Sequence, residues 1–114
     1  MTLLSTLLFS LMSLIMGTSQ EADILFAGDA MQHQGQLDAA RRAVGVYDYT
    51  GCFDAVSPYV KAAYYAIVNL ETPLGYRNFS GYPCFNAPVS YAKALRDAGF
   101  DLMLTANNHC LDRR

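Results

Sequence analysis

The sequence predicts an α/β fold in which short parallel strands alternate with helices. Three short apolar runs, at residues 23–27, 64–70 and 101–106, are separated by two segments with helical patterns. Each run ends in polar residues of the kinds that bind metals or transfer protons. Ligands of open α/β sheets bind outside the carboxyl ends of the strands. The order strand–helix–strand–helix–strand therefore predicts parallel strands, right-handed crossovers and a candidate active site at one edge of the sheet.

The N-terminal residues have the pattern of an export signal. Residues 3–16 are almost purely apolar, and the first charged residue is Glu21. This length suits the apolar region of a signal peptide and falls short of the roughly 20 residues that span a bilayer. We expect residues 1–19 to be a signal peptide, with small residues near a cleavage site, or an N-terminal membrane anchor; a buried helix is the alternative. The protein is then exported, to the periplasm or cell envelope.

Charge and cysteine content exclude several classes of protein. The formal net charge is −2, and acidic and basic residues are interspersed, so the basic stripe of a nucleic-acid-binding protein is missing. The three cysteines, Cys52, Cys84 and Cys110, show no C-x-x-C spacing, which excludes a zinc ribbon or a thioredoxin-like motif. They form either one disulfide with one free thiol or three small buried side chains.

The first half of the chain begins with a strand that is apolar on both faces, and we expect it to be fully buried. Residues 36–44 follow as a short helix, with Leu37, Ala40 and Val44 on one side, and residues 45–51 as a loop. A second helix is predicted to start near Asp54, whose carboxylate caps the first turn. Proline is tolerated in that first turn. The apolar face of this helix comprises Val56, Tyr59, Val60 and Ala63.

The second half continues with the strand at 64–70 and a long irregular loop at 73–88. The loop is rich in aromatic residues, so it forms either a wall of the site or a packed Ω-loop. Ser90 is then expected to cap a helix that runs through Ala98, with Gly99 as the left-handed residue after it. The last strand is at 101–106.

Carboxylate and amide groups follow the first two strands. Asp29 lies at the end of the first strand, where a carboxylate is a suitable ligand for a hard metal ion; a simple turn is the alternative. Asn69 and Glu71 are two residues apart in an extended segment, so they point to the same side. We expect both to face one cavity, and the alternative is that Glu71 caps a turn before Pro73.

The run Asn107-Asn108-His109 follows the third strand. An asparagine oxygen ligates a metal without adding charge, and His109 can protonate a leaving oxygen near neutral pH. Asp112 either orients the His109 imidazole or caps a following helix. His33 either reaches the same centre or is an ordinary surface residue.

These residues, in this order and spacing, resemble the CapA family of bacterial capsule and poly-γ-glutamate synthesis proteins. The resemblance covers residues 23–114, including the loop at 81–85 and the turn at 97–101. The family is related in fold to the calcineurin-like metallophosphoesterases, which implies the β-α-β-α-β portion of their sandwich (α+β in the full family). We therefore expect residues 20–114 to be the N-terminal part of a CapA-like domain, incomplete at its C-terminus, and the chain to be a fragment.

The resemblance also implies roles for individual residues. Asp29 matches the first metal ligand, Glu71 (alone or with Asn69) the second carboxylate, Asn108 the ligating amide and His109 the acid. The implied cofactor is a divalent metal ion, Mn²⁺ or Zn²⁺. The sequence departs from the phosphoesterase pattern because no histidine stands two residues after Asp29.

The implied function is a metal-dependent hydrolase that acts on an extracellular anionic polymer, or with the machinery that makes it. Two alternatives stay open. The first is a non-catalytic accessory or polymer-binding protein of the synthesis complex, and the second is an inactive truncated chain. No nucleic-acid partner is expected.

Overall fold

The computed structural model describes residues 21–113, so the predicted signal peptide or anchor at 1–19 lies outside the described residues. Within 21–113, no helix has both the length and the apolar character needed to cross a membrane. The elements are β1 (Ile24–Ala30), α2 (Gln34–Ala40), β2 (Arg41–Ala43), β3 (Val46–Tyr47), α3 (Ser57–Ala62), β4 (Tyr65–Leu70), β5 (Leu74–Gly75), β6 (Ala87–Pro88), α4 (Val89–Ala98) and β7 (Leu102–Leu104).

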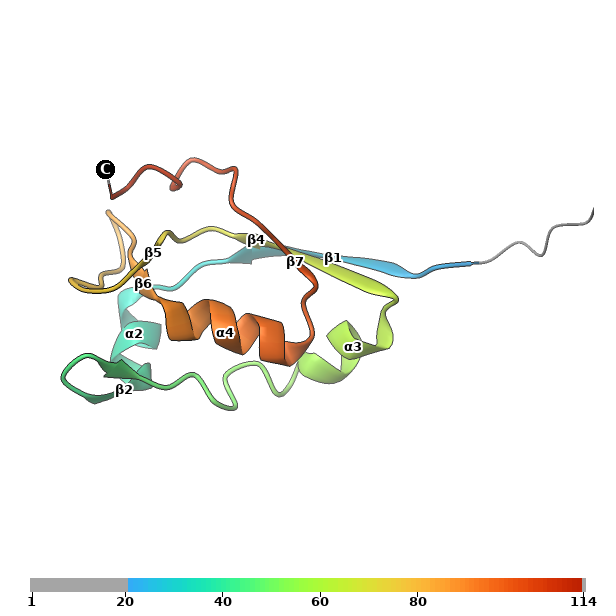
Figure 1. The fold of residues 1–114 in the computed structure, drawn as a ribbon, viewed down its shortest axis with the longest axis horizontal. Coiled ribbons are helices and arrows are strands. Elements are labelled where there is room, and N and C mark those ends of the chain that lie inside the picture. The colour runs from blue at the N-terminus through green and yellow to red at the C-terminus, as the bar shows by residue number, and fades with distance from the viewer. Residues whose placement is uncertain (1–20, 114) are drawn as a thin grey trace, which may run out of the picture.

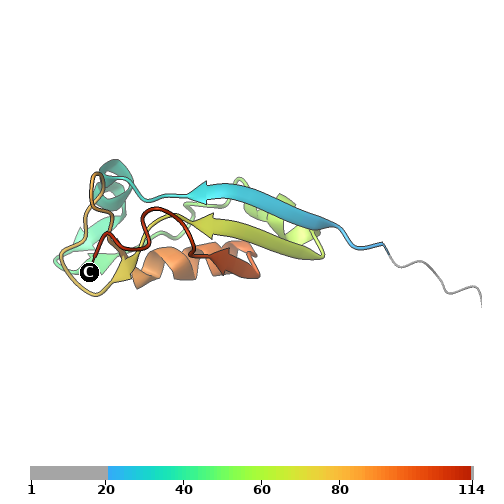
Figure 2. The ribbon, with the colours of Figure 1, turned by 90° about the horizontal axis from the view of Figure 1, so that it is seen from above.

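A three-stranded parallel sheet forms the centre of the fold, in the order β1-β4-β7. Phe26 of β1 pairs with Ile67 of β4, which pairs in turn with Leu102 of β7. Figure 2 shows the strands side by side, with helices behind them. The predicted α/β class and the parallel arrangement of the three strands are confirmed.

One face of this sheet is covered by helices. The helices α3 and α4 lie together on that side (Figure 1), and their Val60 and Leu95 pack in one buried cluster with Ala66 and Val68 of β4. On the opposite face, apolar side chains are exposed among the described residues, and Phe26 has 72% of its surface accessible. The prediction of a fully buried first strand is therefore wrong, because residues 21–113 cover only one side of it. The exposed apolar residues of that face are Ile24, Phe26, Tyr65, Leu102 and Leu104.

The helix predicted at 36–44 is shifted. It begins at Gln34, where the side-chain oxygen of Gln36 accepts the backbone N–H of His33 (2.7 Å), and it ends at Ala40. Residues 41–43 instead pair with β3 in an antiparallel hairpin. Gly45 makes the turn with φ +75°, a left-handed conformation that glycine adopts readily. Val44 is consequently 96% exposed and not part of the apolar side.

The next helix, α3, starts at Ser57 and not near Asp54. Turns occupy residues 50–56, and Asp54 does not cap the helix. Pro58 lies in the first turn, as predicted. The Ser57 hydroxyl donates to the carbonyl of Ala98 (3.0 Å), which fastens α3 to the end of α4. Within α3 only Val60 is buried.

The loop at 73–88 contains more regular structure than the sequence predicts. The strands β5 and β6 form a short parallel pair at its two ends, and Ser80 makes an antiparallel bridge with Asn86. The helix α4 then begins at Val89 with Pro88 as its N-cap residue, so Ser90 does not have the predicted capping role. Gly99 ends α4 with φ +115°, as predicted.

The three cysteines are free and exposed. This overturns the alternative in which they are small buried side chains, and no disulfide joins them. Each lies in a turn or loop outside the core cluster: Cys52, Cys84 and Cys110.

Candidate functional site

The carboxyl ends of β1 and β4 bring two predicted site residues together. Asp29 is the register partner of Asn69 in the parallel ladder. The Asn69 amide nitrogen donates to Asp29 Oδ1 (2.8 Å) and also to Glu71 Oε2. Two carboxylates therefore converge on one neutral amide group. The contact between Asn69 and Glu71 agrees with the prediction that these two residues point to the same side.

Burial differs sharply between the two carboxylates. Glu71 is only 5% exposed, and its backbone N–H donates to the carbonyl of Ala30 (3.2 Å), whereas Asp29 is exposed. In residues 21–113, neither carboxylate has a Lys, Arg or His nitrogen within 4.0 Å. The site thus holds two acidic groups whose only shared partner is an uncharged donor.

Asn107 connects this pair to the loop after β7. Its side-chain nitrogen donates to Asn69 Oδ1 (3.2 Å) and to the carbonyl of Leu70 (3.0 Å). Its side-chain oxygen accepts the backbone N–H of His109 (3.1 Å). Asn108, the predicted ligand, is exposed, and its side chain takes part in none of the hydrogen bonds found in 21–113. Sequence reasoning identified the Asn-Asn run but did not single out Asn107 as its connecting member.

His109 and Asp112 form a contact of their own. The His109 Nδ1 atom lies 3.0 Å from Asp112 Oδ2, and the two side chains are only 18% and 14% exposed. The same oxygen accepts the backbone N–H of Phe85 (2.7 Å). The Phe85 amide lowers the pKa of Asp112, burial acts against this, and His109 lowers that pKa further. Residues 109–113 form turns, so the alternative in which Asp112 caps a following helix has no support within the described chain.

Aromatic contacts bring the second histidine to the same region. The Phe85 ring lies edge-on to the His109 ring, with centroids 4.7 Å apart. It also lies edge-on to the His33 ring at 5.1 Å. His33 is exposed at the N-terminus of α2. Nothing in the sequence pattern indicated that Phe85 touches both histidines.

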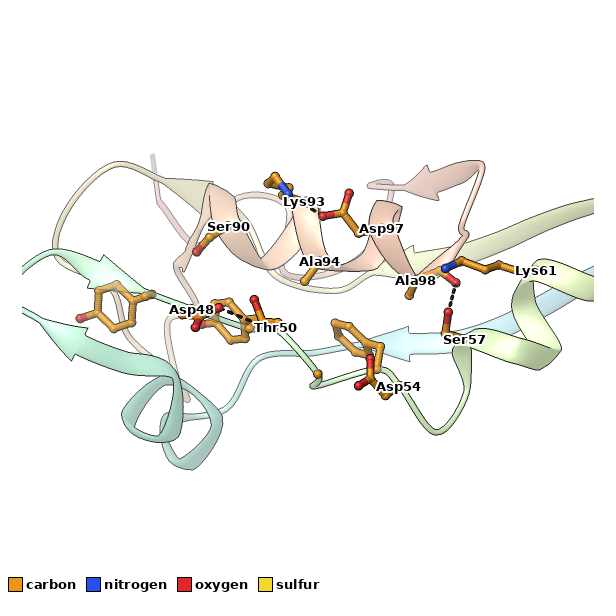
Figure 3. A pocket seen from close by; sticks show the side chains of 14 residues that line it. Asp48, Thr50, Asp54, Ser57, Lys61, Ser90, Lys93, Ala94, Asp97 and Ala98 are labelled. Atoms are coloured by element: carbon orange, nitrogen blue, oxygen red, sulfur yellow. Dashed lines mark hydrogen bonds and ion pairs between the residues drawn. The ribbon is translucent and has the colours of Figure 1, made fainter.

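Of two hollows in the described part of the chain, one lies away from the Asn69 network and the other is bordered by Asp29. A polar pocket of about 270 Å³ is lined by α4 and the segment 47–57, and none of the predicted site residues line it (Figure 3). Several of its charged groups are already engaged: Lys93 pairs with Asp97 (2.5 Å), and Asp48 accepts the Thr50 N–H (2.9 Å). An apolar hollow of about 580 Å³ lies along β1, with Asp29 among its lining residues.

Comparison with known proteins identifies the family of the chain. The comparisons with curated proteins and with solved structures give no match. The family profile "Bacterial capsule synthesis protein PGA_cap" matches residues 23–114, which include both strand ends and the His109 turn. The chain therefore belongs to the bacterial capsule synthesis protein family.

Proposed function

We propose that this capsule synthesis protein is a metal-dependent hydrolase that cleaves a phosphoester or γ-glutamyl amide bond during synthesis of an envelope polymer. The observation that carries the proposal is the convergence of Asp29 and Glu71 on the Asn69 amide, with no cationic side chain beside them in 21–113. Two neighbouring carboxylates without a positive partner favour a bound cation.

The donor set supports a hard divalent ion. Carboxylate and amide oxygens suit Mg²⁺ or Mn²⁺, whereas Zn²⁺ prefers histidine and cysteine. Among residues 21–113, no three His, Cys, Asp or Glu side chains are placed together so that they could hold a metal ion, and in this proposal amide oxygens or substrate complete the coordination. Asp29 and Glu71 would hold the ion, with Asn69 beside them and Asn108 as a further proposed ligand. A divalent ion bound there supplies a Lewis acid and lowers the pKa of bound water.

His109 supplies the proton in this proposal. Asp112 holds the Nδ1 edge of the imidazole, so Nε2 is left for the substrate. As water attacks the phosphorus or carbonyl carbon, the bond to the leaving oxygen or nitrogen breaks. The imidazolium then transfers its Nε2 proton to that leaving atom.

A second function is favoured by a different observation. The loop at 73–88 presents tyrosines to solvent, and Tyr82 is 77% exposed. Exposed tyrosine rings suit the binding of a sugar or peptide polymer. In this alternative, the protein is a non-catalytic accessory of the synthesis machinery.

The protein acts outside the cytoplasm in both versions. The apolar run at 3–16 and the family's role in capsule synthesis support export to the cell envelope. The partner is then an extracellular anionic polymer or its biosynthetic machinery. Fusion of residues 1–40 to a phosphatase that is active only outside the cytoplasm tests export, and an inactive fusion contradicts it.

Metal binding by the full chain is the first test of the hydrolase proposal. We expect calorimetric titration with Mn²⁺ to show binding that Glu71→Gln and Asp29→Asn each weaken at least tenfold. Asp38→Asn changes an exposed carboxylate on α2 and is the matched control. Unchanged binding in the first two variants, or no binding in the parent protein, contradicts the metal site.

Turnover separates the two functions. We expect Mn²⁺-dependent hydrolysis of a phosphodiester or γ-glutamyl peptide by the parent protein. His109→Ala should abolish it and leave Mn²⁺ binding intact. A protein that binds Mn²⁺ and the polymer without hydrolysing any of these substrates is the accessory of the second function.

A further inference from the structure

The loop at 76–86, here called the aromatic loop, is closed on itself by hydrogen bonds. The buried Asn86 side chain donates to the carbonyls of Arg77 (2.8 Å) and Asn78 (3.0 Å). Ser80 and Asn86 exchange both of their backbone hydrogen bonds (3.0 and 2.9 Å). Because its polar groups are paired internally, the aromatic loop is a defined platform for whatever packs on it.

The aromatic loop is also held against α2. The Gly81 N–H donates to the side-chain oxygen of Gln34 (3.2 Å). A Cβ atom at Gly81 would lie 2.5 Å from the Gln34 backbone nitrogen, so only glycine permits this approach without a shift. The aromatic loop is thereby fixed relative to the central fold and not only within itself.

The segment after β7 folds back over this platform, as Figure 1 shows near β5 and β6. Arg113 donates to the Ser80 hydroxyl and, at 3.4 Å, to the Cys84 carbonyl. Asp112 Oδ2 accepts the Phe85 N–H at 2.7 Å. The turn that carries His109 is therefore docked on the aromatic loop by two consecutive side chains.

Phe85 is the point at which the aromatic loop meets His109. Its side chain is 1% exposed, and its ring packs edge-on against the imidazole at 4.7 Å. One residue thus makes two contacts: its ring touches the histidine, and its amide holds the carboxylate that the histidine faces.

We propose that Phe85 is a positioning residue that fixes the orientation and the neutral tautomer of His109. An ionised Asp112 only accepts hydrogen bonds, so the His109 Nδ1 atom that faces it must carry the hydrogen. The Nε2 atom of the neutral ring is then without hydrogen and is directed away from Asp112. The inference rests on the proposed function in that Nε2 is the atom that exchanges a proton with substrate.

The tautomer is measured by two-bond ¹H–¹⁵N correlation of the imidazole nitrogens in the full chain, at a pH where the rings are neutral. The sequence contains only two histidines, so the signals are few. We expect His109 to be mainly the Nδ1–H tautomer in the parent protein. Leucine keeps the backbone N–H that holds Asp112 and removes only the ring that packs on the imidazole. In Phe85→Leu we therefore expect the His109 ring to turn away from Asp112 and to give a tautomer mixture closer to free histidine, together with moved ring-proton shifts of both histidines, because each loses the neighbouring ring.

Phe79→Leu is the matched control. Phe79 belongs to the same loop, but its ring packs edge-on against Tyr47 (5.0 Å) and not against a histidine. This variant should leave the His109 tautomer unchanged. If Phe85→Leu does not fold, the parent protein alone still tests the inference. A predominant Nε2–H tautomer of His109 in the parent protein overturns it. An unchanged tautomer in a folded Phe85→Leu protein overturns it as well.

Kinetics separate this inference from the proposed function. Where the parent protein turns over substrate, we expect Phe85→Leu to lower kcat about tenfold with KM nearly unchanged, since orientation acts on the chemical step. A parent protein without turnover defeats the proposed function, while the tautomer result still stands by itself. Normal kcat with an unchanged tautomer in Phe85→Leu defeats the role of Phe85 alone.

Discussion

Asn107→Ala is the most direct test of how the strand ends are joined. The Asn107 side chain makes three hydrogen bonds: to the Asn69 side chain, to the Leu70 carbonyl, and from the His109 N–H. Alanine removes all three and keeps the backbone bond from the Cys110 N–H to the carbonyl of residue 107 (3.4 Å). The variant should therefore loosen the turn that carries His109 while the β1-β4-β7 sheet persists.

The expected loss of stability follows from these three bonds. A protein hydrogen bond contributes a net of about 1 kcal/mol, which gives about 3 kcal/mol for the set. Asn107 is only partly buried, and water replaces part of the lost bonding. We therefore expect a decrease of about 2 kcal/mol in the free energy of unfolding.

The neighbouring residue provides the control. Asn108 is the same residue type, is exposed, and makes no side-chain hydrogen bond within 21–113, so Asn108→Ala should change stability by less than about 0.5 kcal/mol. Urea unfolding followed by circular dichroism measures both variants, and hydrogen exchange of residues 107–113 reports the loosened turn. Equal effects of the two substitutions would refute the assignment of Asn107 as the connecting residue.

Two other predictions concern the core. Burial raises the pKa of the Tyr91 hydroxyl to about 12 in the folded protein, whereas in the unfolded chain it is about 10. The unfolded chain therefore loses this proton at lower pH than the folded protein does. The contribution of Tyr91 to the free energy of unfolding is complete below about pH 10 and is lost as the pH rises through about 12. In urea unfolding at about pH 8–12, Tyr91→Phe should reduce the loss of unfolding free energy at alkaline pH by about 2–3 kcal/mol. Tyr76→Phe changes an exposed tyrosine and is the control. If the unfolding free energy of Tyr91→Phe falls with pH as steeply as that of Tyr76→Phe, the prediction is contradicted. Gly99→Ala should lower stability by about 1–3 kcal/mol in thermal unfolding, because φ is +115° and the added Cβ lies 2.6 Å from Lys61 Cγ. Gly35→Ala should not be destabilising, because no atom lies within 4 Å of the added Cβ. Equal losses of stability in Gly99→Ala and Gly35→Ala would exclude the backbone conformation of Gly99 as the cause.

The features that local sequence determines were predictable. Apolar runs located all three central strands, and polar residues at their ends located the Asn69 network. Gly99 was recognisable as a left-handed helix end, because few other residues adopt that conformation at low cost. The spacing of Asn69 and Glu71 predicted that both side chains point to the same side, and the two are hydrogen-bonded to each other.

The features that depend on distant contacts were not predictable. The apolar periodicity of 36–44 favours a helix, yet residues 41–43 pair with β3 once Gly45 turns the chain. Neither the contact of Phe85 with His109 nor its bond to Asp112 leaves a signal in sequence spacing, because 24 and 27 residues separate the partners. Whether Asn107 or Asn108 bonds to the Asn69 side chain depends on the path of the backbone after β7. Two adjacent residues of the same type give no indication of that path.

A single irregularity in β1 determines which residue of β4 lies opposite Asp29. Side chains alternate along a strand, so in a regular ladder Gly28 would pair with Asn69 and Asp29 would point toward the helices and the apolar core. The register instead shifts between Ala27 and Asp29, and Asp29 becomes the partner of Asn69. The shift places the exposed Asp29 carboxylate beside the Asn69 amide, whereas an unpaired charge inside the buried cluster would be costly. The bond from Asn69 to Asp29 Oδ1 therefore depends on one extra residue in the strand, and the meeting of two carboxylates depends on it too.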